Sequence, residues 1–394
     1  MKKLLLLCLL GLSTASALLA EETLDEVISR HIKARGGLEN WQNVQSLRLT
    51  GTFTAFSMPK PFTLLHARPD HLYFDHFLGK LPNLIAHDGQ HFWTICPSFH
   101  HQTPALLPPG YIPLARQFAE FVTPFFDYKQ RGFSLELKGR GELLGQPGIV
   151  LELTRENGWK ETWYLDPETY LEFACLSDGF ELNLVYPQQT FFSDFRSVQG
   201  LQIPFLVETE FGPRNRVMEV EKVEINPSHD VALFKMPFSP VMAPLKFMLG
   251  DWDVAIHKLL YRGGAWVDVK TTSSIQAQGD NNLFMEKTQL PAIFGLGPVV
   301  RMLSWDKFHN VFQMTEFDTA SNHNNHFKGT LSEGILTLDN LGSGTEWPFW
   351  GDTFFTKIVM KQVSEEGFVI ERLDSYDDGA TWIQSQETRY TRKR

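Results

Sequence analysis

The sequence predicts a mainly β protein, and three observations lead to this class. Short runs in which apolar and polar residues alternate follow one another from residue 47 to residue 225 and again after residue 250. Turn-forming pairs separate these runs, among them Asp88-Gly89, Asn157-Gly158 and Asp378-Gly379. Aromatic residues make up 13% of the chain, which suits sheets with a large apolar interior. Many short strands with regular turns and little helix favour a barrel or a sandwich.

The first twenty residues have the form of an export signal. Lys2 and Lys3 precede an apolar run, residues 4–12, that is too short to span a bilayer. Ala17 and Ala20 are candidate cleavage points. We therefore expect residues 1–20 to be removed and the mature protein to be exported, periplasmic or secreted, and soluble. An uncleaved anchor is the alternative.

The mature chain is expected to open with a helix followed by a strand. Thr23 and Glu26 have the spacing of a capping box, and the apolar residues that follow recur on one helical face. Gly36-Gly37 supplies a left-handed stop. After Val44 the apolar period changes to two, which indicates the first strand.

One apolar segment interrupts the strands of the first half and predicts a helix over residues 114–126. Pro113 lies near its first turn. Its apolar side chains share one helical stripe: Leu114, Phe118, Phe121, Val122 and Phe125. Core packing is the simpler interpretation, whereas a Phe-rich helix that covers a half-barrel would enclose a cavity for an apolar ligand. These five residues are the candidate ligand-binding residues.

Prolines punctuate residues 227–244, and we place a domain boundary there. The first domain covers residues 21–238 and the second covers residues 239–394. Within the second domain, residues 290–300 are apolar but contain Gly and Pro. This run is either a mobile entrance loop or a buried connection.

Composition limits the partners that the protein can take. The formal net charge is −10, which disfavours nucleic acid and anionic membrane surfaces. Cys96 and Cys175 remain after signal cleavage. An exported protein permits a disulfide, but two cysteines do not make a framework, so their pairing stays open.

Catalytic and metal-binding patterns give no convincing site in the sequence. It contains no G-x-S-x-G, no H-E-x-x-H and no Walker loop. His87 and His91 flank a turn, and His323 and His326 fall in a polar stretch. We therefore interpret all four as polar turn and loop residues in preference to metal ligands. We expect no cofactor, no metal site and no catalytic residue, although metal binding by these histidines stays open.

Four motifs of the first half resemble, in the same order, those of the periplasmic outer-membrane lipoprotein-carrier (lipoprotein-sorting) superfamily. They are the helix-Gly-Gly-strand opening, Ala86-His87-Asp88-Gly89 with Trp93, TWYLDPET at 162–169, and DFRSVQGLQIP at 194–204 followed by LFKMP at 233–237. The resemblance implies a half-open β-barrel with helices on its concave face, which holds acyl chains.

The second half resembles a lipocalin-like (calycin) domain family of unknown function. The resemblance is carried by FMLGDW at 247–252, YDDGATW at 376–382 and ETRYTR at 387–392. It implies a closed barrel in which Trp252 closes the floor beneath a basic residue of the last strand. The first choice for that residue is Arg389 and the second is Arg392.

The chain is thus expected to form a half-open β-barrel with covering helices, followed by a closed lipocalin-like β-barrel. The expected function is to bind or carry a lipid or another apolar small molecule in the cell envelope, without covalent chemistry. We expect no nucleic-acid partner, and a transient contact with a membrane is possible. One alternative is an envelope enzyme that acts on a small apolar substrate, which a cleft with a His in reach of a carboxylate would favour. Another is an interaction module with filled barrels.

Overall fold

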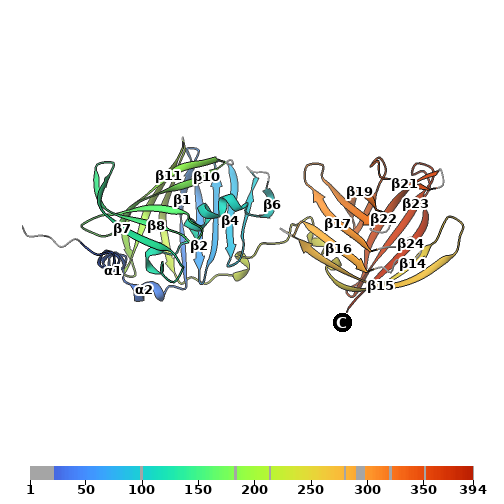
Figure 1. The fold of residues 1–394 in the computed structure, drawn as a ribbon, viewed down its shortest axis with the longest axis horizontal. Helices are drawn as coiled ribbons and strands as arrows, with labels where there is room; N and C mark the ends of the chain where they lie inside the picture. The colour runs from blue at the N-terminus through green and yellow to red at the C-terminus, as the bar shows by residue number, and fades with distance from the viewer. Residues whose placement is uncertain are drawn as a thin grey trace, which may run out of the picture. The chain divides into compact units, whose positions relative to one another are not determined.

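The computed structural model describes residues 22–97, 101–181, 184–212, 214–278, 281–289, 298–318, 322–349 and 352–393. The predicted export signal and residues 290–297 of the second apolar run lie outside these ranges. The chain is mainly β, with 61% strand and 11% helix (Figure 1). It divides into a first unit, residues 22–68 with 116–227, and a second unit, residues 69–115 with 228 onwards. The domain boundary between residues 238 and 239 stays a prediction.

The helical opening of the first unit is confirmed. Helix α1 (Leu24–Ala34) is capped by Thr23, whose hydroxyl accepts from the Glu26 amide while the Glu26 carboxylate accepts from the Thr23 amide. The helix ends before Gly36 and Gly37, which have φ angles of 111° and 90°. A short helix α2 (Leu38–Gln42), which the sequence pattern did not indicate, buries Trp41 before the first strand.

The strands of the first unit form a large open antiparallel sheet. Their order is β2-β1-β13-β12-β11-β10-β9-β8-β7, so the first strand pairs with the last one in sequence. Their bounds are β1 (Ser46–Ala55), β2 (Met58–Ala67), β7 (Ser134–Leu143), β8 (Gln146–Thr154), β9 (Lys160–Leu165), β10 (Glu172–Glu181), β11 (Leu184–Val198), β12 (Leu201–Phe211) and β13 (Arg214–Ile225).

The helix predicted over residues 114–126 is shorter than expected. Helix α3 (Ile112–Ala119) stops well before the end of the apolar stripe, and a separate 3-10 turn, η3 (Pro124–Phe126), follows. Pro124 prevents a helix from continuing to residue 126, because it has no amide hydrogen to donate and disfavours helical backbone at the residue before it. Thr123 accordingly has an extended ψ of 144°.

The second unit contains four strands in consecutive antiparallel hairpins and a closed antiparallel barrel. The hairpin strands are β3 (His71–Leu78), β4 (Leu81–Asp88), β5 (Phe92–Cys96) and β6 (His101–Leu106), and the short turns are η2 (Pro109–Tyr111), η4 (Val231–Leu233) and η5 (Ala243–Met248). The barrel region contains β14 (Gly250–Leu259), β15 (Trp266–Gln278), β16 (Leu283–Gln289), β17 (Val299–Asp306), β18 (Val311–Asp318), β19 (His323–Ser332), β20 (Ile335–Asp339), β21 (Trp347–Phe349), β22 (Asp352–Ser364), β23 (Gly367–Ser375) and β24 (Ile383–Arg392).

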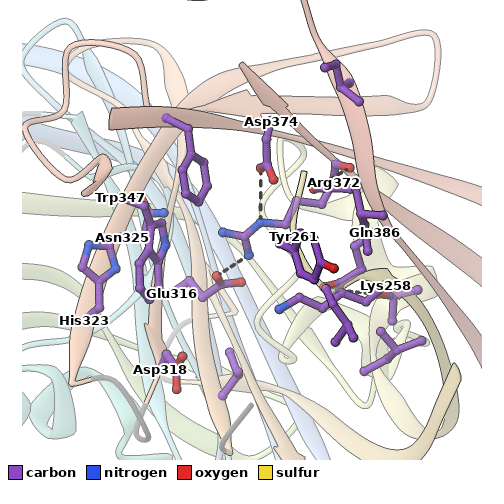
Figure 2. A pocket seen from close by; sticks show the side chains of 18 of the residues that line it. Lys258, Tyr261, Glu316, Asp318, His323, Asn325, Trp347, Arg372, Asp374 and Gln386 are labelled. Carbon is purple, nitrogen blue, oxygen red and sulfur yellow. Dashed lines mark hydrogen bonds and ion pairs between the residues drawn. The ribbon is translucent and has the colours of Figure 1, made fainter. Parts of the chain in front are cut away.

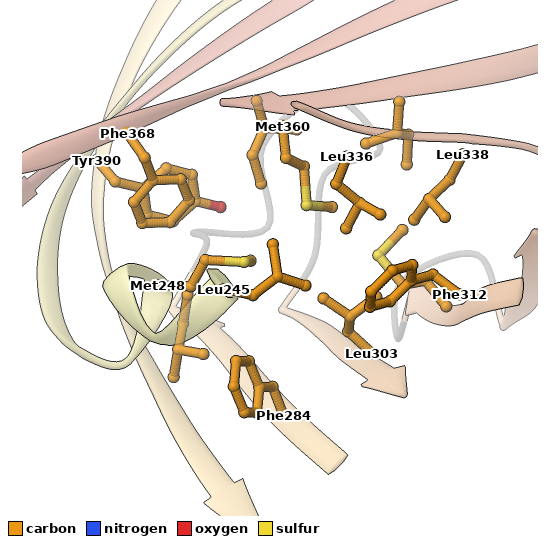
Figure 3. Close-up of a cluster of buried hydrophobic side chains, with 14 of the residues drawn as sticks. Leu245, Met248, Phe284, Leu303, Phe312, Leu336, Leu338, Met360, Phe368 and Tyr390 are labelled. Carbon is orange, nitrogen blue, oxygen red and sulfur yellow. The ribbon is translucent and has the colours of Figure 1, made fainter. Parts of the chain in front are cut away.

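Ten of these strands close the barrel, because β14 pairs with both β15 and β24 while β20 pairs with β22. The inward-facing positions change character along each strand. On β14, buried Trp252, Val254 and Ile256 lead to Lys258, and on β23 buried Phe368 and Ile370 lead to Arg372. One end of the interior is therefore a packed apolar core (Figure 3), whereas the other end is a polar pocket (Figure 2).

Trp252 lies in that apolar core, as the lipocalin-like resemblance implied, but the basic residue beside it is the second choice. The Trp252 side chain is 1% exposed, and its indole N–H donates to the Met248 carbonyl. The Arg392 guanidinium lies 4.4 Å from the indole ring, whereas Arg389 is exposed and pairs with Glu387. Side chains alternate along β24, and Arg389 and Arg392 are three positions apart, so they point to opposite sides of the sheet. Only Arg392 shares the side of Trp252.

Two expectations for histidines are wrong. His87 is not a solvated turn residue, because it is buried, stacks on Phe92 and bonds the Asp70 carbonyl. His323 and His326 lie in strand β19 and not in a loop. The strand forms because every residue from 323 to 329 pairs with β18. Cys96 and Cys175 are both buried, and neither forms a disulfide within the described residues.

Candidate functional site

The first unit contains a cavity of about 190 Å³ between its sheet and residues 118–124, a segment that begins in the last turn of helix α3. Phe118, Phe121 and Val122 cover it from that segment. The sheet contributes apolar side chains from β1, β2, β12 and β13: Leu47, Leu49, Leu64, Ile203, Val207, Met218 and Val220. These residues are mostly two apart on each strand, so the period-two pattern that folds the sheet also lines the cavity.

The five candidate residues separate in the structure. Phe118, Phe121 and Val122 line the cavity and are partly exposed, so they form its outer cover. Phe125 is 1% exposed and packs edge-on against Trp163 in the neighbouring core. Leu114 lies in helix α3, but its side chain is not among those described. The cavity therefore combines three of the five residues, and their role as ligand contacts stays a prediction.

Ion pairs stand at the edge of this apolar cavity. Arg35 Nη1 donates to Glu172 Oε1 over 2.6 Å, and both side chains are buried. Glu120 receives Arg131 and Arg155, at 2.6 and 2.8 Å. These guanidinium groups hold the pKa of the Glu120 carboxyl below its ordinary value, against the effect of its burial. Arg155 Nε also bonds Glu161 at 2.7 Å, so the three cations pair with three carboxylates.

Two buried histidines support the same region and are neutral near pH 7. His31 Nδ1 donates to the Tyr170 carbonyl, so its Nε2 accepts from the Thr123 hydroxyl at 2.7 Å. Burial lowers the pKa of His31 to about 3 and that of His66 to about 4. His66 lines the cavity and donates from Nε2 to the Phe118 carbonyl, which holds the cover against the sheet.

Chemistry beyond binding has little support at this cavity. Its nearest His–carboxylate approach is His31 Nδ1 to Glu172 Oε2 at 3.9 Å, beyond hydrogen-bond length, and both His31 nitrogens already have partners. Burial raises the pKa of the Cys175 thiol, so this cavity residue is a poor nucleophile. Within the described ranges, no three His, Cys, Asp or Glu residues gather as metal ligands would.

The sequence signal for the cover was its run of phenylalanines, whereas the ion pairs gave no signal. Arg35 and Glu172 are far apart in the chain and meet only in the fold. None of the described helices has the length and apolar character needed to cross a membrane.

No protein-family model and no curated protein matches the chain. Solved structures do match. A LolA superfamily protein from Nitrosomonas europaea is 11% identical, with a TM-score of 0.37 over 54% of this chain and 98% of that one. A DUF1329 family protein from Desulfovibrio piger is 11% identical, with a TM-score of 0.38 over 54% of this chain and 96% of that one.

An outer membrane lipoprotein-sorting protein domain from Vibrio parahaemolyticus is also similar, with 11% identity and a TM-score of 0.38 over 53% of this chain and 94% of that one. The identities and TM-scores are low, so these likenesses carry no argument about function. Over about half of its length, the chain has structural neighbours in the LolA superfamily and among outer-membrane lipoprotein-sorting domains.

Proposed function

We propose that the protein is an exported, soluble carrier that binds a lipid acyl chain or another apolar small molecule in the first-unit cavity. The observation that carries this proposal is the cavity lining: a preformed, mainly apolar concavity whose cover, Phe118, Phe121 and Val122, remains partly exposed. Ligand sites have this character, with a few fixed polar groups at the edge.

The volume of the cavity favours a small ligand. Its volume of about 190 Å³ lies below the range of roughly 300–1,000 Å³ that is common for small-molecule pockets. A single acyl chain or one ring system fits such a space better than several acyl chains. The export signal supports a site of action in the cell envelope, where such ligands occur.

An envelope enzyme that uses this cavity is the weaker candidate. General acid–base catalysis needs a titratable group that can exchange protons near the working pH. His31 and His66 have pKa values of about 3 and 4 and bond to backbone or hydroxyl partners. Their positions support the wall of the cavity and not a reaction in it.

The substitution Phe118→Asp tests the carrier proposal on the full mature chain. It places a charge in an apolar lining, and an unpaired buried charge is costly. We expect binding of cis-parinaric acid, followed by its fluorescence, to weaken by about tenfold or more, since 1.4 kcal/mol corresponds to tenfold. Lipid that co-purifies with the wild type, detected by native mass spectrometry, should be lost.

The matched control is Leu144→Asp, because Leu144 is 82% exposed and has a positive φ that Asp tolerates. This control should bind the probe as the wild type does. If Phe118→Asp fails to fold, Phe118→Ser provides the same comparison without a charge. Equal binding by wild type and both Phe118 variants would contradict the proposal and leave the cover as ordinary core.

A further inference from the structure

The barrel has a second pocket that the proposed function does not use. It measures about 460 Å³, within the range of roughly 300–1,000 Å³ typical of small-molecule sites. It lies at the polar end of the interior, opposite in character to the apolar core around Trp252. Its lining combines aromatic and apolar side chains with charged ones (Figure 2).

Most charges of this pocket are already paired in a chain that runs across strands. Arg301 lies between Glu286 and Glu316, with N···O distances of 3.0 and 2.7 Å. Arg372 bonds the other Glu316 oxygen at 2.8 Å. These two cations and two carboxylates balance, and the two guanidinium groups lower the pKa of Glu316 to about 2. This chain holds Arg372 in place at the wall of the pocket.

Lys258 is a lining cation outside this series of ion pairs, as is Arg262, which lies over the Tyr376 ring. It is an inward-facing residue of β14 that lines the pocket, yet it makes no ion pair within 4 Å among the described residues. Its pKa is lowered first by burial and then by the charge of Arg372, so the two cations repel each other across the pocket. Glu316, Asp374 and Asp318 act on the pKa of Lys258 in the opposite direction, Glu316 most strongly, without compensating fully.

The rest of the lining defines what an occupant must present besides charge. Trp347 and His323 pack at 4.3 Å between ring centroids, and Phe354 and Tyr376 at 5.5 Å. Tyr261 and Ile383 are exposed lining residues and therefore lie toward solvent. Such aromatic walls bind a flat or apolar body through its faces and edges.

We propose that the barrel pocket binds a small aromatic or apolar acid, whose anionic group lies between Lys258 and Arg372 and whose body lies against Trp347 and Tyr376. Two neighbouring cations that line one pocket can bind a carboxylate, sulfonate or phosphate through charge-assisted hydrogen bonds. The anion would relieve the repulsion between Lys258 and Arg372, so the charges of the pocket favour the ligand-bound state. This site is independent of the carrier cavity in the first unit.

The test uses two fluorescent probes that share a ring system and differ in charge. Anilinonaphthalene sulfonate is an anion, and N-phenylnaphthylamine is its uncharged counterpart. We expect the full-length wild type to bind the sulfonate about tenfold more tightly, and Lys258→Met to remove this preference while Lys258→Arg retains it. Lys270→Met is the matched control, since Lys270 is an exposed lysine of the adjacent strand β15.

Three further results discriminate between the sites. Phe118→Asp should leave sulfonate binding unchanged, and naphthoate should displace the sulfonate at concentrations where inorganic phosphate does not. Lys258→Met should melt at the same or a higher temperature than the wild type, because it removes a repelled cation, and this shows that the variant folds. The proposal would be overturned if the wild type bound both probes with equal affinity, or if Lys258→Met and Lys270→Met lost sulfonate binding equally. It would also be overturned if only Phe118→Asp lost sulfonate binding, or if only phosphate displaced the sulfonate.

Discussion

The cavity of the first unit and the pocket of the barrel are built by the same device but handle charge differently. Both are lined by alternate residues of antiparallel strands. In the first unit, ions such as Arg35 and Glu172 pair at the edge of an apolar space. In the barrel, a series of ion pairs enters the space, and Lys258 lines the same space without an ion pair within 4 Å among the described residues. Strand pattern therefore sets where a cavity forms, while the placement of unpaired charge sets what it accepts.

The largest expected effect tests whether the apolar end of the barrel is independent of the first unit. Trp252→Ala should destabilise the barrel by about 3–5 kcal/mol in chemical denaturation, because it removes a large side chain that is 1% exposed. Trp266→Ala, at a tryptophan that is 41% exposed, is the control and should cost much less. Binding of cis-parinaric acid should not change. If Trp252→Ala abolishes it, the two regions are not separable.

The two regions should also lose stability at different pH values, which is a smaller effect. Unfolded histidine binds a proton near pH 6.5, whereas native His31 and His66 stay neutral down to pH values of about 3 and 4. Falling pH therefore favours unfolding of the first unit from pH 6.5 downward. Native Glu316 stays ionised to pH about 2 against an ordinary pKa of 4.5, so its contribution to the barrel is lost only below pH 4.5.

Calorimetry from pH 7 to pH 3 measures this difference, with the barrel transition identified by its shift in Trp252→Ala. The first unit should lose stability at a higher pH, and His31→Gln should flatten its curve. Glu172 in the first unit has a raised pKa and acts in the opposite direction, while partly exposed His323 adds a small early loss in the barrel. Parallel curves for both transitions, or no effect of His31→Gln, would contradict the prediction.

The smallest effect concerns the connection near the predicted boundary. Phe234 and Ser239 are buried, whereas Lys235 between them is exposed. Trypsin should therefore cut first after Lys235, and the melting temperatures of both fragments should shift little from those in the intact chain. Lys235→Gln should delay this cut. Early cleavage spread through residues 50–220 would instead show that the boundary is misplaced.

Sequence patterns with local causes were the most reliable predictors. The capping box of α1 and the short alternating strands were predictable because each depends on neighbouring residues. The helix over 114–126 was predicted too long because its apolar stripe was given more weight than Pro124. The choice of Arg389 over Arg392 failed because the facing residue depends on strand register. The barrel pocket gave no signal, because its charged residues come from separate strands.

The ion-pair chain of the barrel also restricts how its strands can assemble. Arg301 on β17 stands directly opposite Glu286 on β16 and Glu316 on β18. A slip of β17 by one residue turns Arg301 outward, because side chains alternate, and leaves Glu286 facing inward without its arginine and Glu316 with Arg372 alone. Removing one partner of a buried pair costs about 3–5 kcal/mol. The buried charges therefore help to select the correct strand register, because a barrel with a misaligned β17 is less stable even without a ligand.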